Sequence, residues 1–362
     1  MSKKKLSHKQ KWYKEIVLTK DDSVYVGLDV HKKSIHVAIW LNNGIALTYV
    51  CPPKYEPIVK DLEQLRPALK KIVYEAGPTG FGLLRALRKA KLPAAIIAPS
   101  KTPTSRSQEA KTDRLDAQAL AKLAAKEMLT EIAIPTLQEE EDRQVSRLRD
   151  QLIAKRVRIR QQIKSFLLQH SIEAPKGLAS WRQSGIKELS EMPLPKHLKF
   201  CIKRYLDEQA FIVEQLLEIE LELNDVFESK RHKKQVKILR SHPGVGIVTS
   251  RQFRAEIFNP KRFATSDEIG KYIGFSPRTI ETGDSHKDGR IMKTGRRRLR
   301  ANLIEASWVW IGKDPKAKAT FNRLLRNTGN ANKAIVGIAR RLTIHLWAML
   351  CHETYYQPSL SC

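Results

Sequence analysis

The first third of the chain has the hydrophobic pattern of a β-sheet. Three runs of seven residues, VYVGLDV (24–30), SIHVAIW (34–40) and GIALTYV (44–50), are rich in β-branched and aromatic residues, and LNNG joins the second run to the third. Such runs between turn residues are typical of strands, and Asn-Gly between two of them is a hairpin signal. The pattern therefore predicts three antiparallel strands.

Beyond these strands the pattern alternates between helix and strand. A polar, helix-compatible stretch (56–70) precedes the strand KIVYEA, the turn GPTG, the helix FGLLRALRKAK and the strand AAIIAP. A loop rich in Ser, Thr and Pro follows, and then an Ala- and Leu-rich helix that begins near AKTDRLDAQALA (110–121). Strands that first meander and then alternate with helices predict a mixed α/β sheet.

Residues 143–236 show a helical period and no strand signal. Apolar residues recur every three, four or seven positions, which predicts two long amphipathic helices packed as a coiled-coil hairpin or against a partner chain. The apolar positions are Val145, Leu148, Leu152, Ile159, Ile163 and Phe166 in the first helix, and Ile202, Tyr205, Ile212, Leu216, Ile219, Leu223 and Val226 in the second. A segment with Pro and Gly between them is the expected turn region.

The last third predicts a mostly α-helical unit. Two short helices flank Pro243–Gly246, a Gly-rich basic loop follows, and helices run from 297 to 356. No repeat of fixed period is evident. We therefore expect a basic leader (1–22), a mixed α/β domain (23–142), a coiled-coil middle (143–236) and a helical C-terminal domain (237–362).

Charge points to a polyanionic partner. The 362 residues include 66 Lys and Arg against 38 Asp and Glu, a formal net charge of +28. Such an excess favours nucleic acid ahead of an acidic membrane surface. The four cysteines lie far apart without a C-x-x-C pair, so neither a zinc ribbon nor a disulfide framework is indicated. Without a run of about eighteen apolar residues or a signal-peptide core, a cytoplasmic protein with no membrane partner is expected.

Four acids in the first domain stand out against this charge. Asp29 and Glu75 end two predicted strands, and Asp113 and Asp116 lie three residues apart on one helix face. Each alone could be a turn, capping or solvated residue favoured by the helix dipole. Convergence of all four would be costly without a counterion, and Mg²⁺ takes carboxylate, water and phosphate oxygens. The order of strands and helices around the acids favours a metal site for phosphodiester chemistry.

Three motifs around these acids carry a family resemblance. GLDVHK, YEAGPTG and KTDRLDAQALA, in this order and spacing, resemble the DEDD motif of the IS110 (IS-one-ten) family of insertion-sequence transposases. That family has an RNase H-like N-terminal domain similar to RuvC resolvase. The resemblance implies a catalytic, metal-binding tetrad of Asp29, Glu75, Asp113 and Asp116.

The resemblance continues in the last third, so that it covers most of residues 25–349. HPGVGIVTSRQFRAEI, YIGFSPRTIETGDSHKDGRIMKTGRRRLRANLIEASW and NKAIVGIARRL are similar to the C-terminal transposase domain of the family. Members recombine DNA with a structured bridge RNA that pairs with donor and target DNA. The resemblance thus implies Mg²⁺, two DNA partners and a guide RNA. Recombination of two duplexes also predicts self-association, as a dimer or tetramer, through the long helices.

The chain departs from the family at the nucleophile. The family has a Ser directly before a Gly, whereas IETGDSHKDG puts Thr282 at the matching position and Ser285 three residues later. The β-methyl of a Thr restricts χ1 and crowds an in-line attack. Either hydroxyl could attack, or this copy could be inactive. A primary hydroxyl on a Gly-flanked loop slightly favours Ser285.

A dense basic run follows these hydroxyls. Against one acid, Asp288, it contains Lys287, Arg290, Lys293, Arg296, Arg297, Arg298 and Arg300. That density predicts contacts with nucleic-acid phosphates, with a solvated basic face as the alternative. Gly244 and Gly246 in HPGVG resemble a helix-hairpin-helix turn, whose backbone N–H groups bind phosphate, although a plain helix–helix turn fits as well.

These features favour an RNA-guided, Mg²⁺-dependent transposase that forms a covalent protein–DNA intermediate. Two alternatives remain open. One is a hydrolytic RNase H-like nuclease or Holliday-junction resolvase that uses the four acids alone, and the other is a non-catalytic nucleic-acid-binding remnant. The sequence leaves open the target site, the guide RNA and the number of metal ions.

Overall fold

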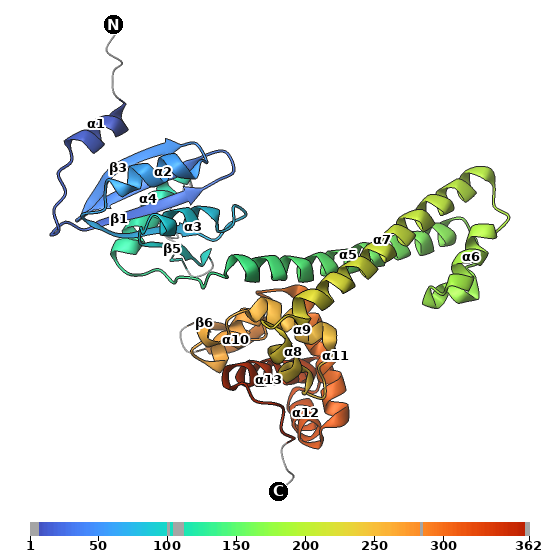
Figure 1. Cartoon of the computed structure of the whole chain (residues 1–362). Helices are drawn as coiled ribbons and strands as arrows, with labels where there is room; N and C mark the ends of the chain where they lie inside the picture. The colour runs from blue at the N-terminus through green and yellow to red at the C-terminus, as the bar shows by residue number, and fades with distance from the viewer. Residues whose placement is uncertain (1–6, 100–101, 104–111, 283–284, 359–362) are drawn as a thin grey trace. The chain divides into compact units, whose positions relative to one another are not determined.

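The computed structural model describes residues 7–99, 102–103, 112–282 and 285–358, of which 278–282, 285–288 and 290 are described by their backbone alone. The chain forms two compact units, Met1–Ile134 and Pro135–Cys362 (Figure 1). The first unit contains the α/β sheet, and the second contains the long helices together with the helical C-terminal region. The fold class expected from the sequence is confirmed.

The first unit is built on a five-stranded sheet of order β3-β2-β1-β4-β5. Its strands are β1 (Val24–Val30), β2 (Ile35–Leu41), β3 (Gly44–Cys51), β4 (Leu69–Glu75) and β5 (Ala94–Ile97). The pairs β1–β2 and β2–β3 are antiparallel, whereas β1–β4 and β4–β5 are parallel. The expected antiparallel meander is therefore confirmed, and the sheet is mixed.

Helices cover both faces of this sheet. Helices α2 (Tyr55–Glu63) and α3 (Gly82–Lys89) share a core with alternate residues of β1 and β4. Helix α4 (Asp113–Ala125) packs on the opposite face. The expected leader also belongs to this unit, because α1 (His8–Glu15) buries part of Trp12 against the α2/α3 core.

The contact between α4 and the sheet is unusually close. A Cβ atom added at Gly27 of β1 would lie 2.1 Å from the Ala117 carbonyl oxygen and 2.5 Å from the Ala121 nitrogen. Ala38 of β2 joins these two alanines in a fully apolar contact. Small residues on both surfaces therefore let the α4 backbone lie directly on β1, which fixes where the helix begins relative to the strand end.

The second unit begins with the helical hairpin predicted from the heptad-like pattern. Helices α5 (Leu137–Gln169) and α7 (Lys196–Glu228) lie side by side and share one apolar core (Figure 1). The segment between them, expected as a turn region, also contains a 3-10 helix (Lys176–Ser180) and α6 (Gln183–Glu191). Leu178 and Leu189 bury these short helices against the hairpin core.

In the part of the second unit that the structure describes, six further α-helices pack around one core. They are α8 (Lys233–Arg240), α9 (Ile247–Ile257), α10 (Ser266–Ile273), α11 (Arg297–Lys313), α12 (Pro315–Thr328) and α13 (Ala331–His352). Among the described residues, α13 alone is long and apolar enough to span a membrane, and half of that stretch is buried inside the unit. Helix α13 is thus the central core helix of this region.

The Gly-rich basic loop expected after α10 is instead a β-hairpin. Strands β6 (Pro277–Thr282) and β7 (Ser285–Ile291) pair antiparallel. The residues between them read Gly-Asp, a dipeptide typical of a two-residue hairpin connection. The loop prediction was wrong because the high charge of the second run hid its strand pattern.

We expect Gly27→Ala to destabilise the sheet of the first unit. The added methyl group would meet backbone atoms that cannot rotate away, so the cost should be about 3 kcal/mol. Hydrogen exchange of the β1 amides in the full chain measures this opening free energy locally. In the control Gly44→Ala the new Cβ has no atom within 4 Å, so the opening free energy of the β1 amides should change by less than about 0.5 kcal/mol. Equal exchange in the two variants would contradict the close-contact interpretation.

Candidate active site

Two of the four predicted acids lie at the carboxyl ends of neighbouring parallel strands. Gly27 faces α4, so Asp29, two residues further along β1, faces the same side of the sheet. Leu28 pairs with Tyr74 of β4, which makes Glu75 the next residue on the neighbouring strand. Because the carboxyl ends of parallel strands meet at one edge, Asp29 and Glu75 share that edge.

The other two acids occupy the first turn of α4. The side chain of Thr112 caps the helix by accepting a hydrogen bond from the Leu115 N–H at 3.4 Å. Asp113 and Asp116 follow in the first turn, where the positive end of the helix dipole stabilises negative charge. The cap and the close packing at Gly27 together bring this turn to the end of β1.

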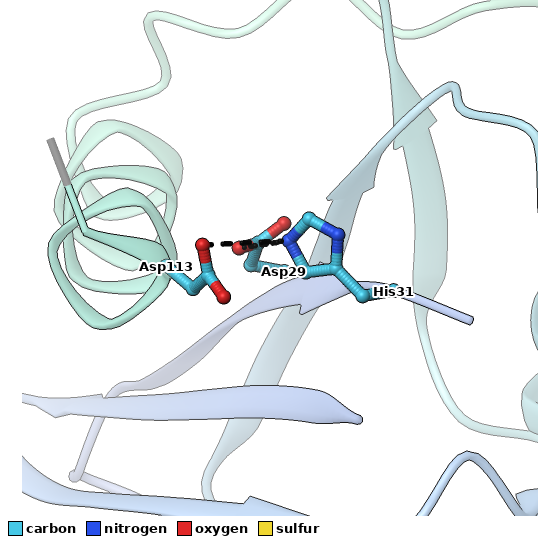
Figure 2. A group of neighbouring side chains, drawn as sticks. All are labelled: Asp29, His31 and Asp113. Carbon is cyan, nitrogen blue, oxygen red and sulfur yellow. Dashed lines mark hydrogen bonds and ion pairs between the residues drawn. The ribbon is translucent and has the colours of Figure 1, made fainter. Parts of the chain in front are cut away.

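The structure brings Asp29 and Asp113 together through a histidine. His31 Nε2 lies 2.8 Å from Asp29 Oδ2 and 3.7 Å from Asp113 Oδ1 (Figure 2). The ligand atoms of these three side chains all lie within 4.8 Å of one another. From β2, His36 Nε2 lies 3.5 Å from Asp113 Oδ2. Two carboxylates and two imidazoles therefore meet above the end of β1.

The cluster is open to a substrate. The side chains of Asp29 and Asp113 are 20% and 52% exposed. Glu75 is exposed at the same sheet edge, and Asp116 is half-buried one helical turn after Thr112. The measured cluster joins Asp29 to Asp113, with His31 between them.

The donor set fits a divalent cation. Carboxylate oxygens suit Mg²⁺ and Mn²⁺, and an imidazole nitrogen adds a donor that suits Mn²⁺ better than Mg²⁺. A cation held by Asp29 and Asp113, with His31 beside it, would polarise a phosphoryl oxygen or lower the pKa of a bound water. The site thus has the chemistry of phosphodiester cleavage.

Sequence reasoning missed both histidines. The signal was present, because His31 follows Asp29 by two residues, the spacing that repeats a direction along a strand. His36 is paired directly with Asp29 across β1 and β2. The antiparallel pairing of β1 with β2 would have placed His36 next to the acid.

The two candidate nucleophiles form one cross-strand pair. Thr282, the last residue of β6, pairs with Ser285, the first residue of β7. Residues 283–284 and both hydroxyl groups lie outside the described part of the structure. The two positions therefore lie opposite each other at the end of one hairpin.

The basic run begins within β7 and continues into α11. Lys293, Arg297 and Arg298 are exposed. The side chains of Lys287 and Arg290 lie outside the described residues. Arg296 is half-buried, with Nε 3.4 Å from Glu256 Oε1.

Two residues that were predicted to bind nucleic acid, Arg300 and Gly244, instead make contacts within the second unit. Arg300 is buried and donates hydrogen bonds to the carbonyl oxygens of Ile273, at 3.1 Å, and Thr294. Gly244 is buried, and an added Cβ would lie 2.4 Å from the Ala306 carbonyl oxygen. Both residues therefore have packing roles. Gly246 is exposed at the N-terminus of α9, with open space around it.

Comparisons with known proteins agree with this site. A family model described as Transposase, for the DEDD type of IS110, matches residues 26–172, which contain the Asp29–Asp113 cluster. A second model, described as Transposase IS116/IS110/IS902 family, matches residues 236–322, which contain the β6–β7 hairpin. Together they cover more than half of the chain, in both units.

Individual relatives have low sequence identity to this chain but match it over most of its length. The putative transposase y4rJ of Sinorhizobium fredii is 27% identical over 303 residues, which cover 76% of this chain and 76% of the relative. The transposase for insertion sequence element IS1533 of Leptospira borgpetersenii is 27% identical over 297 residues, 79% of this chain and 84% of the relative. The chain belongs to the IS110 family of DEDD transposases, which are recombinase enzymes that act on DNA.

Proposed function

We propose that this transposase is an RNA-guided DNA recombinase, in which a divalent-cation site and a hydroxyl nucleophile act together on donor and target DNA. The observation that carries the proposal is the meeting of Asp29 and Asp113, from a strand end and a helix start, with donor atoms close enough for one cation. Mg²⁺ is the proposed ion, held by Asp29 and Asp113 with Glu75 and Asp116 at the same sheet edge. The reaction belongs in the cytoplasm of a bacterial or archaeal cell.

The proposed chemistry is transesterification. The hydroxyl oxygen of Ser285 or Thr282 attacks a backbone phosphorus, an O–P bond to the protein forms, and one P–O bond to deoxyribose breaks. The proton of the attacking hydroxyl ends on the departing deoxyribose oxygen. The phosphoester stays on the protein, so a new strand end can reverse the step without an external energy source. Lys293, Arg297 and Arg298 are exposed nearby in sequence and would stabilise the added negative charge.

Guide RNA would supply sequence specificity. In other RNA-guided systems base pairing determines sequence specificity, while the protein recognises the backbone and the shape of the nucleic acid. The excess of 66 Lys and Arg over 38 Asp and Glu suits a protein that binds several nucleic-acid strands at once. The competing function is hydrolysis, in which water at the four acids replaces the protein hydroxyl.

Self-association is proposed through the α5/α7 hairpin, which carries opposite charges along its length. Residues 205–229, in α7 and its C-cap, contain eight Asp or Glu and no Lys or Arg. Residues 151–172, in the second half of α5 and the three residues after it, contain five Lys or Arg and no acid. Because α5 and α7 run antiparallel, the acidic and basic stretches lie toward opposite ends of the hairpin. A second copy in the reverse direction would match each acidic stretch to a basic one.

Apolar side chains on α7 support the same arrangement. Phe211, Leu217 and Leu221 are 58%, 66% and 68% exposed on the isolated chain. Exposed apolar residues within a charged helix are typical of a protein interface. The second copy would bury them.

A covalent adduct with DNA tests the proposed chemistry. Protein, element-encoded RNA, donor and target DNA and Mg²⁺ are mixed, and a denaturing gel is scanned for protein-linked DNA. We expect an adduct that Ser285→Ala abolishes and Thr282→Val retains, because a primary hydroxyl is less crowded. The opposite pattern would assign Thr282. Cleavage without any adduct, preserved in the double variant, would establish the hydrolytic alternative instead.

Direct titration with cations tests the metal site. Asp29→Asn and Asp113→Asn should each weaken Mn²⁺ and Mg²⁺ binding by at least about tenfold, since even outer-shell changes often cost that much. Isothermal titration of the full chain without nucleic acid gives the affinities. Asp21→Asn, an exposed aspartate in the same unit, makes the same chemical change and should leave them unaltered. Unchanged affinity in both site variants would contradict the metal assignment.

Charge exchange tests the self-association surface. Glu214→Lys, Glu218→Lys and Glu222→Lys together should weaken dimerisation at least about tenfold, measured by sedimentation equilibrium at about 0.1 M salt. Adding Lys155→Glu, Arg158→Glu and Lys164→Glu should restore it, because both charge patterns are then reversed. The control Glu188→Lys, on exposed α6 surface, should have little effect. A wild-type chain that sediments as a monomer even with nucleic acid bound would refute this surface.

A further inference from the structure

A cavity of about 520 Å³ lies in the second unit, between helices α11, α12 and α13 and the segment that follows α13. Its lining includes four residues that carry or can carry positive charge and three aromatic residues. They are Lys316, Arg341, His345 and His352, and Trp310, Tyr355 and Tyr356. Ligand sites in proteins commonly occupy about 300–1,000 Å³, so the volume suits one small molecule or one residue of a polymer.

The aromatic side of the cavity is fixed in place. The Trp310 ring lies 5.2 Å from the His345 ring, and the buried His242 ring packs behind Trp310 and Tyr356 at 4.8 and 4.5 Å between centroids. The Tyr356 N–H donates to Ser241 Oγ at 2.8 Å, which fastens the segment after α13. Tyr355 stays 49% exposed at the rim. A preformed wall with an exposed ring offers a stacking surface.

The single acid among the described lining residues does not offset the cations. Asp314 Oδ1 accepts hydrogen bonds from the N–H groups of Lys316 and Ala317, and Asp314 Oδ2 accepts from Trp310 Nε1 and the Tyr356 hydroxyl. Burial alone would raise the pKa of Asp314, but these hydrogen bonds hold it below its usual value. The Asp314 carboxylate is thus fully engaged with its own surroundings.

The Arg341 guanidinium is therefore available to bind an external anion. It is exposed on α13, lines the cavity and makes no ion pair or hydrogen bond with the residues that the structure describes. Burial is the main cause that lowers the pKa of the neighbouring His345, and the Arg341 charge adds to it.

We propose that this cavity binds one unpaired nucleotide of a nucleic-acid strand, with the base against Tyr355 and a phosphate at Arg341. An aromatic wall beside a guanidinium matches the two parts of a nucleotide, a flat base and an anion. A base inside a duplex is stacked and paired, so only an unpaired or extruded base can enter. The site would hold a single-stranded segment of RNA or DNA while strands are exchanged elsewhere on the protein.

This inference adds to the proposed recombinase function but does not depend on strand cleavage. It is tested by binding alone, in EDTA, with the full chain and with fluorescein-labelled eight-nucleotide probes. Single-stranded RNA, single-stranded DNA and the corresponding duplexes form separate arms, so the experiment also identifies which strand chemistry the cavity prefers. A failure here leaves the covalent-adduct experiment unaffected, and a missing adduct leaves these affinities unaffected.

Tyr355→Ala and Arg341→Gln should each weaken single-strand binding by about fivefold or more and change duplex binding by less than about twofold. Tyr355→Phe keeps the ring and should keep the affinity. Arg326→Gln, on exposed α12 surface outside the cavity, removes the same charge and should affect single strands and duplexes alike. Fluorescence anisotropy measures all of these affinities.

Cross-linking locates the bound base directly. A probe with 5-iodouracil, irradiated on the wild-type chain and digested, should yield a peptide linked at Tyr355, and Arg341→Gln should reduce its amount about fivefold. Single-strand affinities within twofold of wild type in both cavity variants, cross-links confined to other residues, or no binding of either single strand would each overturn the proposal.

Discussion

The backbone contact between α4 and β1 is the constraint on which the first unit depends. Gly27 lacks a side chain, and Ala117 and Ala121 present the smallest ones, so the helix lies on the strand with no layer of larger residues between them. A larger side chain at any of these positions would lift α4 away from the sheet. Because Asp29 and Asp113 are carried by the two elements in contact, a small displacement would separate the two carboxylates of the proposed cation site.

The second unit relies on buried charge where the first relies on close packing. Glu256 of α9 is 3% exposed, and its carboxylate accepts two hydrogen bonds from Arg147 of α5, at 2.9 and 2.8 Å, and lies 3.4 Å from Arg296. A buried carboxylate is costly unless it is paired and hydrogen-bonded. Gln252 extends the network by donating to Asp150 at 2.7 Å. The start of α11, which follows the β6–β7 hairpin, is thereby fastened to the N-terminal half of the long helix α5.

Much of this organisation could be predicted from the sequence, because hydrophobic period and turn residues report local structure directly. The strands around Asp29 and the two long helices follow from patterns within about thirty residues, whereas the DEDD tetrad came from the resemblance of three separated motifs to a family. Contacts between residues far apart in the sequence do not follow from such local patterns. Nothing local distinguishes Arg296, paired with Glu256, or the buried Arg300 from the exposed Arg297 and Arg298 beside them. The β6–β7 hairpin was missed because its strand pattern is overlaid by charge.

The residues that contact Asp29 and Asp113 explain how a strongly basic protein can keep the proposed cation site free of competing positive charge. In a chain with 66 Lys and Arg, the ion-pair contacts of Asp29 and Asp113 among the described residues are with His31 and His36. A Lys or Arg in the same place would hold a permanent positive charge against the carboxylates and compete with the metal. A neutral imidazole can instead donate one hydrogen bond to a carboxylate, or give its lone pair to a cation. Histidine can therefore order the acids without repelling the cation proposed to bind there.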